Sequence, residues 1–230
     1  MAALIWDKTG ERQFETGVDH GVLYVQKADG TYENGVVWNG LTAVTESPDG
    51  AEPNNLYADN IKYASLRSAE TFGATIEAYM FPEEFMECDG SAAMAEGVYI
   101  GQQSRKPFGF SYRTLIGNDT ASDSDDGYKL HIIYNATASP SDKNYETVND
   151  SPDAITMSWE IDTTPVPVTG KKPTATITID STKCDAQKLK TLEDTLYGTA
   201  TAEAYLPQPD TVLHIFDNNH AADDRDTGKY

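Results

Sequence analysis

The chain has 230 residues, with 37 acidic and 17 basic side chains and a formal net charge of −20. This length is enough to bury a sizeable core, and the 39% hydrophobic content argues against a disordered chain. The carboxylate excess excludes ordinary nucleic-acid binding by a basic face and disfavours an anionic membrane surface. No segment approaches the roughly 20 apolar residues of a membrane span. The first eight residues lack a secretory pattern, so we expect synthesis in a cytoplasm.

Alternation of apolar and polar residues predicts that β-strands make up most of the chain. In 155–161, for example, isoleucine, methionine and tryptophan alternate with threonine, serine and glutamate. Asn-Gly and Asp-Gly pairs mark turns between several of these segments. The expected strands, in chain order, are 22–26, 36–38, 61–66, 74–80, 108–113, 130–134, 155–161, 174–179 and 212–216.

One amphipathic helix is expected over 185–197. Three leucines fall on one stripe of this segment, as a helix packed against a core requires. Asp185 lies at the start, where the helix dipole favours an acid, and Gly198 follows the last apolar turn, where helices often end. The stripe consists of Leu189, Leu192 and Leu196.

A shorter helical turn is expected to begin near Pro82, because a proline loses no hydrogen bond at a first helical position. This turn would carry Phe85 and Met86 inward. The strands come in runs and do not alternate with helices, which predicts an antiparallel β-sandwich or closed β-structure with one packed helix. We expect a single domain over 1–216.

Three segments are predicted to be irregular. Residues 45–60 contain two prolines and many turn-forming residues, and residues 117–127 are polar throughout. Loops of this length inside a domain are usually functional or mobile. We expect 45–60 to order against a neighbouring subunit. Residues 217–230 are polar and charged, which predicts a flexible C-terminal extension.

Clustered acids in 117–127 leave a weak cation site as an alternative to a solvated turn. Their spacing does not match an EF-hand loop. Cys88 and Cys184 are expected to be reduced and buried, although a disulfide between them stays open. The acids are Asp119, Asp123, Asp125 and Asp126.

No catalytic, cofactor-binding or metal-binding residue is predicted. The four histidines have no second ligand at metal-binding spacing. A nucleophile elbow and a phosphate-binding loop are both missing from the sequence. We expect His131 and His214 within strands and His20 in a turn at a strand entrance. Trp6, Trp38 and Trp159 are expected in the core.

Several strings in order along the chain resemble the major tail protein, or tail tube protein, of long-tailed bacteriophages of Gram-positive bacteria. They cover nearly everything from residue 3 to about residue 216, whereas the segment after 217 matches nothing in that family. The strings include ALIWDKTGER (3–12), ETGVDHGVLYV (15–25), WNGLTAVTESP (38–48), LYADNIKY (56–63), FGATIEAY (72–79), ECDGSA (87–92), GVYIGQQSRKPFG (97–109), GYKLHIIYNATASPS (127–141), NDSPDAITMSWE (149–160) and PTATITIDSTK (173–183).

The resemblance implies a structural virion protein that assembles as stacked hexameric rings around a tape-measure protein. Tail terminator and baseplate proteins would be further partners, and DNA would pass through the tube without specific binding. The resemblance also implies a β-sandwich or closed β-structure with a flanking helix. The protein would be located in the virion tail after assembly in the host cytoplasm. It would have no enzymatic activity, cofactor or membrane partner. An acidic wall fits a conduit that repels phosphate.

Two alternatives from other classes stay open at this point. One is a carbohydrate-binding β-sandwich, which exposed coplanar aromatic side chains would favour. The other is a carboxylate-pair hydrolase, because any pair among 37 acids can lie close in space. A pocket that holds two acids, one with a raised pKa, would favour the hydrolase.

Overall fold

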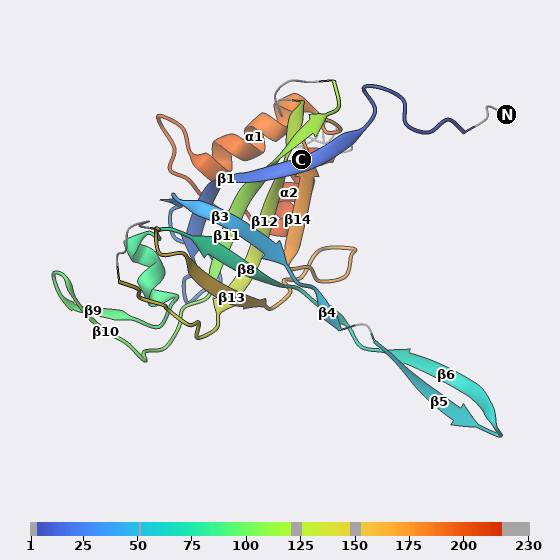
Figure 1. Cartoon of the computed structure of the whole chain (residues 1–230), viewed down its shortest axis with the longest axis horizontal. Coiled ribbons are helices and arrows are strands. Elements are labelled where there is room, and N and C mark those ends of the chain that lie inside the picture. The colour runs from blue at the N-terminus through green and yellow to red at the C-terminus, as the bar shows by residue number, and fades with distance from the viewer. Residues whose placement is uncertain (1–3, 51, 121–125, 148–152, 218–230) are drawn as a thin grey trace, which may run out of the picture.

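The computed structural model describes residues 4–50, 52–120, 126–147 and 153–217. A mainly β fold with antiparallel strands is confirmed (Figure 1). Most of it is one eight-stranded sheet in the order β2, β1, β11, β12, β13, β8, β3, with β14 paired to β12. The bounds are β1 Gln13–Val25, β2 Val36–Trp38, β3 Leu41–Glu46, β8 Gly73–Ala78, β11 Phe108–Asn118, β12 Gly127–Ala138, β13 Met157–Thr163 and β14 Thr176–Asp180.

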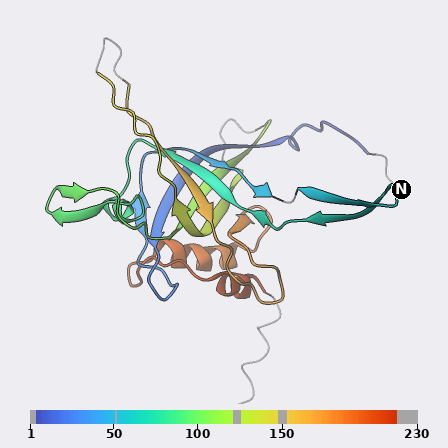
Figure 2. The ribbon, with the colours of Figure 1, turned by 90° about the horizontal axis from the view of Figure 1, so that it is seen from below.

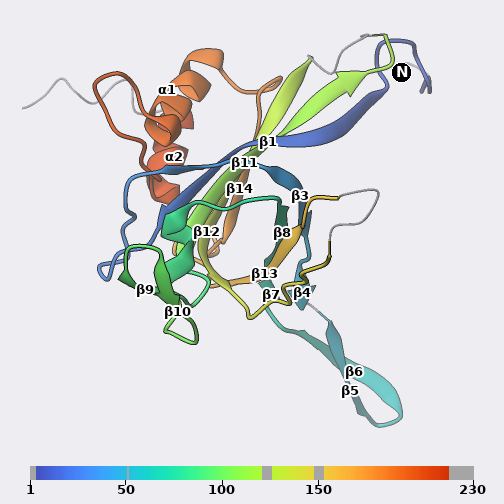
Figure 3. The ribbon, with the colours of Figure 1, turned by 60° about the vertical axis from the view of Figure 1, so that its left-hand side comes forward.

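The sheet curls strongly but is not a closed barrel. Its two end strands, β2 and β3, do not pair with each other in the described part of the chain. Figure 3 shows β13, β8 and β3 facing β1 and β11 across the curled sheet. Of the two expected forms, a β-sandwich or a closed β-structure, the described residues thus show no closed barrel, and the expected antiparallel architecture is confirmed.

The long central strands are buried on both faces. Along β12, Leu130, Ile132 and Tyr134 contribute to one core, and Ile133 between them contributes to the other. The first core fills the concave side of the curl with Trp38, Trp159 and several phenylalanines. The second lies beneath the helices, which occupy one side of the sheet in Figure 2. Two-sided burial explains the consecutive apolar residues from Ile132 to Tyr134.

The predicted amphipathic helix is α1, Ala186–Tyr197, and its leucine stripe is buried in the second core. The Asp185 side chain accepts hydrogen bonds from the backbone N–H groups of Gln187 and Lys188, both at 3.0 Å, so it caps the helix. Gly198 ends the helix at a φ of +77°, a conformation that favours glycine.

A second helix, α2 (Pro209–Phe216), replaces the strand expected over 212–216. The apolar run there has no clear period, and such a run fits a helix as well as a strand. Pro209 occupies the first helical position, and it is buried together with Val212 while Leu213 is 44% exposed. His214 accordingly lies in a helix and not in a strand.

The helical turn expected at Pro82 is the 3₁₀ helix η1, Glu83–Glu87, with Phe85 fully buried. The Phe85 ring packs against Trp38 and Trp159, and its centroid lies 4.5 and 5.2 Å from theirs. A small hairpin follows, formed by β9 (Ala92–Ala95) and β10 (Val98–Ile100).

The segment expected as a loop over 45–60 is largely paired. The short strands β4 (Asp49–Gly50) and β7 (Glu70–Thr71) join the curled sheet to a hairpin of β5 (Pro53–Ala58) and β6 (Ile61–Arg67). Asp59 and Asn60 form its turn with φ values of +50° and +65°, as a type I′ hairpin turn requires. Every residue of β5 is exposed, so the strand has no face buried within the subunit.

Other expectations have mixed outcomes. Trp38 and Trp159 lie in the core, but Trp6 is 75% exposed and lies outside any strand. Cys88 and Cys184 are free thiols in separate cores, the first buried and the second half-buried. Residues 218–230, which include most of the expected flexible extension, lie outside the described residues.

Candidate functional site

The acidic loop expected at 117–127 is described only in part, because Asp123 and Asp125 lie outside the described residues. Asp119 accepts a hydrogen bond from the Gly10 backbone at 2.8 Å and lies 3.5 Å from the Arg12 guanidinium. It therefore fixes the start of the chain to the end of β11. Within the described ranges, no group of three or more histidine, cysteine or acidic residues is arranged to hold a metal ion.

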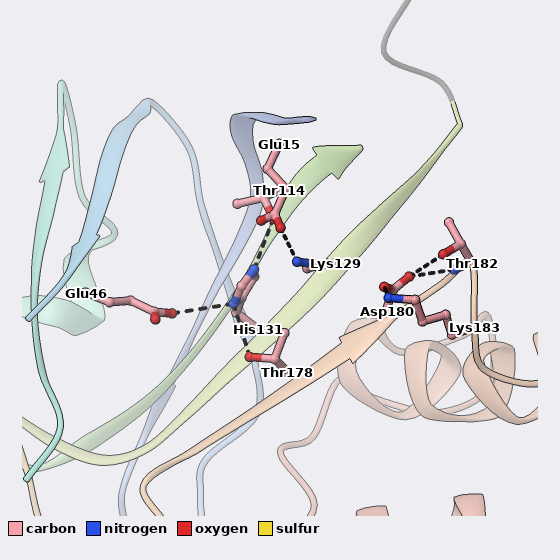
Figure 4. A network of polar contacts seen from close by, with 9 residues as sticks. All are labelled: Glu15, Glu46, Thr114, Lys129, His131, Thr178, Asp180, Thr182 and Lys183. Carbon is pink, nitrogen blue, oxygen red and sulfur yellow. Dashed lines mark hydrogen bonds and ion pairs between the residues drawn. The ribbon is translucent and has the colours of Figure 1, made fainter. Parts of the chain in front are cut away.

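A polar cluster lies on the concave side of the sheet, where three elements meet (Figure 4). The His131 ring stacks on Tyr112 with centroids 4.7 Å apart and planes 5° from parallel. His131 Nδ1 lies 3.5 Å from Glu46 Oε1, and the Tyr112 hydroxyl donates to the same carboxylate at 2.8 Å. The hydrogen bond from His131 is the main reason that the pKa of Glu46 is lowered, and the bond from Tyr112 adds to it.

This cluster joins strands that are far apart in the sheet order. Glu46 ends β3, while Tyr112 and His131 belong to β11 and β12. On the other side of the imidazole, Thr114 Oγ1 lies 3.0 Å from Nε2, and Glu15 pairs with Lys129 next to it. Such a satisfied network fixes how tightly the sheet curls.

A second polar cluster links β1 and β11 to helix α1. The Arg113 guanidinium donates to both carboxylate oxygens of Asp19 at 3.0 and 3.1 Å, and its carbon lies 4.6 Å above the Tyr128 ring. Burial alone would raise the pKa of Asp19, but the hydrogen bonds and charge of Arg113 outweigh it and lower the pKa. Tyr128 donates in turn to Glu193 on α1 at 2.6 Å.

His20 belongs to this second cluster. Its Nδ1 lies 2.8 Å from an Arg113 nitrogen. The residue lies within β1 at a φ of +51°, where the pairing with β11 is irregular, and not at the strand entrance that the sequence suggests. Among the described residues, both clusters connect separate elements of the fold: the first joins β3 to β11 and β12, and the second joins β1 and β11 to α1.

The most conspicuous surface feature is the hairpin of β5 and β6, which projects away from the sheet at one end of the molecule (Figure 1). One of its faces is apolar, and the Ser65 hydroxyl bonds Asn55 across the other at 2.9 Å. Its exposed large side chains are Leu56, Tyr57, Ile61, Tyr63 and Leu66, which are 42–73% exposed. Exposed apolar patches of this kind mark interaction surfaces.

Two further segments expose apolar side chains. Leu4, Ile5 and Trp6, before β1, are each at least 70% exposed. At the end of the molecule opposite the first hairpin, the β9–β10 hairpin exposes Met94 and Val98. Each of these extended segments exposes more apolar surface than a monomer needs, which indicates association with other protein surfaces.

A groove of about 530 Å³ separates the β9–β10 hairpin from η1 and the start of β2. Val36, Met86 and Tyr99 form part of its apolar lining, and the Tyr99 hydroxyl donates to Glu83 at 2.9 Å. Four glutamates, with a single lysine, supply its charged lining: Glu33, Glu83, Glu84, Glu87 and Lys106.

The strand expected over 61–66 is confirmed as β6, whereas β5 and the β9–β10 hairpin were not expected from the sequence. For β5, the signal was Leu56 and Tyr57 at the end of a segment that otherwise looked like a loop. Apolar residues that follow a run of turn-forming residues indicate that the segment contacts another surface. No helix in the described ranges is long and apolar enough to cross a membrane.

A family model described as phage tail tube protein matches residues 10–215, which include the curled sheet, both hairpins and almost all of both helices. A search of curated proteins finds no match.

Proposed function

The chain belongs to the phage tail tube protein family, and we propose that it assembles as hexameric rings that stack into the tail tube of the virion. The family match over 10–215 carries this proposal. The tube is the conduit for DNA during infection, and the subunit acts by assembly without enzymatic activity, metal or cofactor. A tape-measure protein inside the tube and terminator and baseplate proteins at its ends are the further partners, and assembly takes place in the host cytoplasm.

The exposed apolar segments support self-assembly. A monomer would leave the apolar side chains of the β5–β6 hairpin in water, where each fails to gain the free energy of burial. Because this hairpin extends beyond the sheet, it reaches surfaces that the body of the subunit cannot. We therefore assign the contact with a neighbouring subunit, expected for 45–60, to the hairpin 53–67. This hairpin is already paired within the subunit.

The charge of the chain supports passage of DNA without binding. Six copies at −20 each carry −120, and such a ring repels the phosphate backbone. The same charge opposes close approach of subunits at low ionic strength. Salt at about 0.15 M shortens the screening length to roughly 8 Å and weakens this repulsion, whereas apolar contacts persist.

No specific observation favours the two alternatives. A sugar-binding platform needs exposed tryptophans, but Trp38 and Trp159 are buried in the first core and only Trp6 is exposed. Every described carboxyl group whose pKa departs clearly from its ordinary value has a lowered pKa, which is opposite to the shift that a general acid requires. These groups are Asp19, Asp29, Glu46, Asp180 and Asp210.

The proposal is tested by following the size of the purified protein with light scattering while salt is raised, and by imaging the products with electron microscopy. We expect dispersed subunits at low salt, rings or tubes at higher salt or with divalent cations or an initiating tail complex, and no measurable affinity for duplex DNA near physiological salt. A protein that stays monomeric at every salt and protein concentration, and binds an oligosaccharide, would overturn the proposal.

A hairpin deletion tests the role of the projecting segment. Replacing residues 53–67 by a short Gly-Ser linker removes only exposed or half-buried side chains, so the circular dichroism spectrum and melting temperature should stay close to wild type. We expect this variant to form no tubes. Normal tubes from the deletion variant would show that the hairpin does not take part in assembly.

A further inference from the structure

The β5–β6 hairpin and the groove beside the β9–β10 hairpin lie at opposite ends of the molecule. Figures 1 and 2 show the two hairpins projecting in opposite directions along its longest axis. The hairpin of one copy therefore cannot reach the groove of the same copy. Any contact between them joins two different surfaces of two subunits, and such a contact propagates into a ring or a filament.

The hairpin is locally basic in an acidic chain. Residues 53–67 contain Asp59, Lys62 and Arg67, so they carry +1, whereas the remaining residues carry −21. Neither Lys62 nor Arg67 forms an ion pair with a described carboxylate, although most described cations do. These two cations, unpaired within the part of the chain that the structure describes, can pair with acids of a second copy.

The hairpin also has an apolar face. Leu56 lies opposite Ala64, Leu66 lies opposite Asn54, and Ile61 lies opposite Ala58, so these side chains share one face. The cations belong to the other face, but their long aliphatic stems allow the charged groups to reach past the edge of a two-stranded ribbon.

The groove has the complementary chemistry. Its five charged lining residues carry a net charge of −3, and its apolar lining is open to solvent. Lys106 pairs with Glu87, and Glu33 lies 3.7 Å from Lys27. Glu83 and Glu84, at the start of η1, form no ion pair with a described cation and are exposed. The groove thus offers an apolar lining together with two carboxylates that have no basic partner among the described residues.

We propose that the groove between η1 and the β9–β10 hairpin receives the β5–β6 hairpin of a second copy of this chain. Leu56, Ile61 and Leu66 would pack on the groove lining, while Lys62 and Arg67 pair with Glu83 and Glu84. The inference rests on the proposed self-assembly and adds to it the receiving surface and the ion pairs that select it. Opposite charges at these two surfaces offset the repulsion between subunits and fix the register of the contact.

Charge reversal tests the ion pairs. Lys62→Glu with Arg67→Glu should raise the protein concentration needed for tube formation at least about tenfold, as loss of a charged interface contact does. Adding Glu83→Lys with Glu84→Lys should restore assembly. Lys171→Glu with Lys172→Glu is the matched control, because it makes the same change in net charge at exposed positions in a separate turn.

The outcomes separate this inference from the proposed function. A wild-type protein that forms no tubes would overturn the proposed function itself. Tubes from wild type, with equal effects of the hairpin reversal and the control reversal, would overturn only the groove contact. If Glu83→Lys with Glu84→Lys does not restore assembly of the Lys62→Glu, Arg67→Glu variant, the groove contact is likewise overturned.

Cross-linking gives a second measurement that does not depend on charge-reversed variants folding. Tyr63→Cys and Glu84→Cys, both at exposed positions, are made separately in a Cys184→Ser background, mixed, assembled and treated with a short bismaleimide. We expect a covalent dimer in mixed tubes but not in tubes of either variant alone. Tyr63→Cys mixed with Lys171→Cys is the control, and equal dimer yields in the two mixtures would contradict the proposal.

Discussion

The helix α1 provides a sharp test of how the second core is held together. Leu192 is fully buried at the middle of the stripe, with Leu189 and Leu196 on either side of it and the sheet beneath. Leu192→Ala removes three carbon atoms, at about 0.8 kcal/mol of transfer free energy each. The flanking leucines limit collapse of the site, so the cavity adds to this loss and the total is about 3–4 kcal/mol. For a chain of this length, we expect the melting temperature to fall by about 10 °C.

The measurement is thermal and urea denaturation of the dispersed subunit, followed by circular dichroism at low salt. Leu213→Ala is the matched control, because it makes the same chemical change on α2 at a side chain that is 44% exposed. We expect the control to lose less than half as much stability, since exposed surface contributes little transfer free energy. Equal losses for the two variants would refute the packing of α1 on the sheet as the source of the effect.

Three further predictions concern the polar cluster, the thiols and the helix cap. Because hydrogen bonding from His131 lowers the pKa of Glu46, its stabilising contribution is complete above about pH 4.3 and is lost as the pH falls through the folded-state pKa. Glu46→Gln should therefore lower the melting temperature at pH 7 more than at pH 3, and a loss independent of pH would contradict this. Burial raises the pKa of Cys88 to about 12, so a thiol reagent at pH 8 should label Cys184 in the native protein and Cys88 only after unfolding; rapid native labelling of Cys88 would argue against its burial. Asp185→Ala removes the two capping hydrogen bonds of α1 and should cost about 1 kcal/mol in urea denaturation, whereas an unchanged midpoint would mean that the cap contributes nothing.

Patterns with one buried face were predictable from the sequence. The alternation in 155–161 and 174–179 corresponds to β13 and β14, and the leucine stripe corresponds to α1 with its cap and final glycine. Each of these elements packs one side on a core, and burial of one side imposes a period on the residues. The order of family-like strings also indicated the tail tube family without any structural information.

Elements without a one-sided environment were not predictable. Of the hairpin 53–67, only β6 was expected, as the strand over 61–66. Strand β5 is exposed along its whole length, and the turn at Asp59 and Asn60 was hidden among many turn-forming residues. Helix α2 packs through Pro209 and Val212 in an apolar run that fits either secondary structure.

The sequence by itself determined a mainly β, acidic chain with a packed helix and a tail tube relationship, because these depend on composition, local periodicity and strings of adjacent residues. Only the tertiary structure decided that Glu46 meets His131 across the curl, and that the β5–β6 hairpin and the acidic groove lie at opposite ends. Both depend on contacts between residues far apart in the chain. Such contacts are set by how the whole sheet twists and curls, which no local pattern encodes.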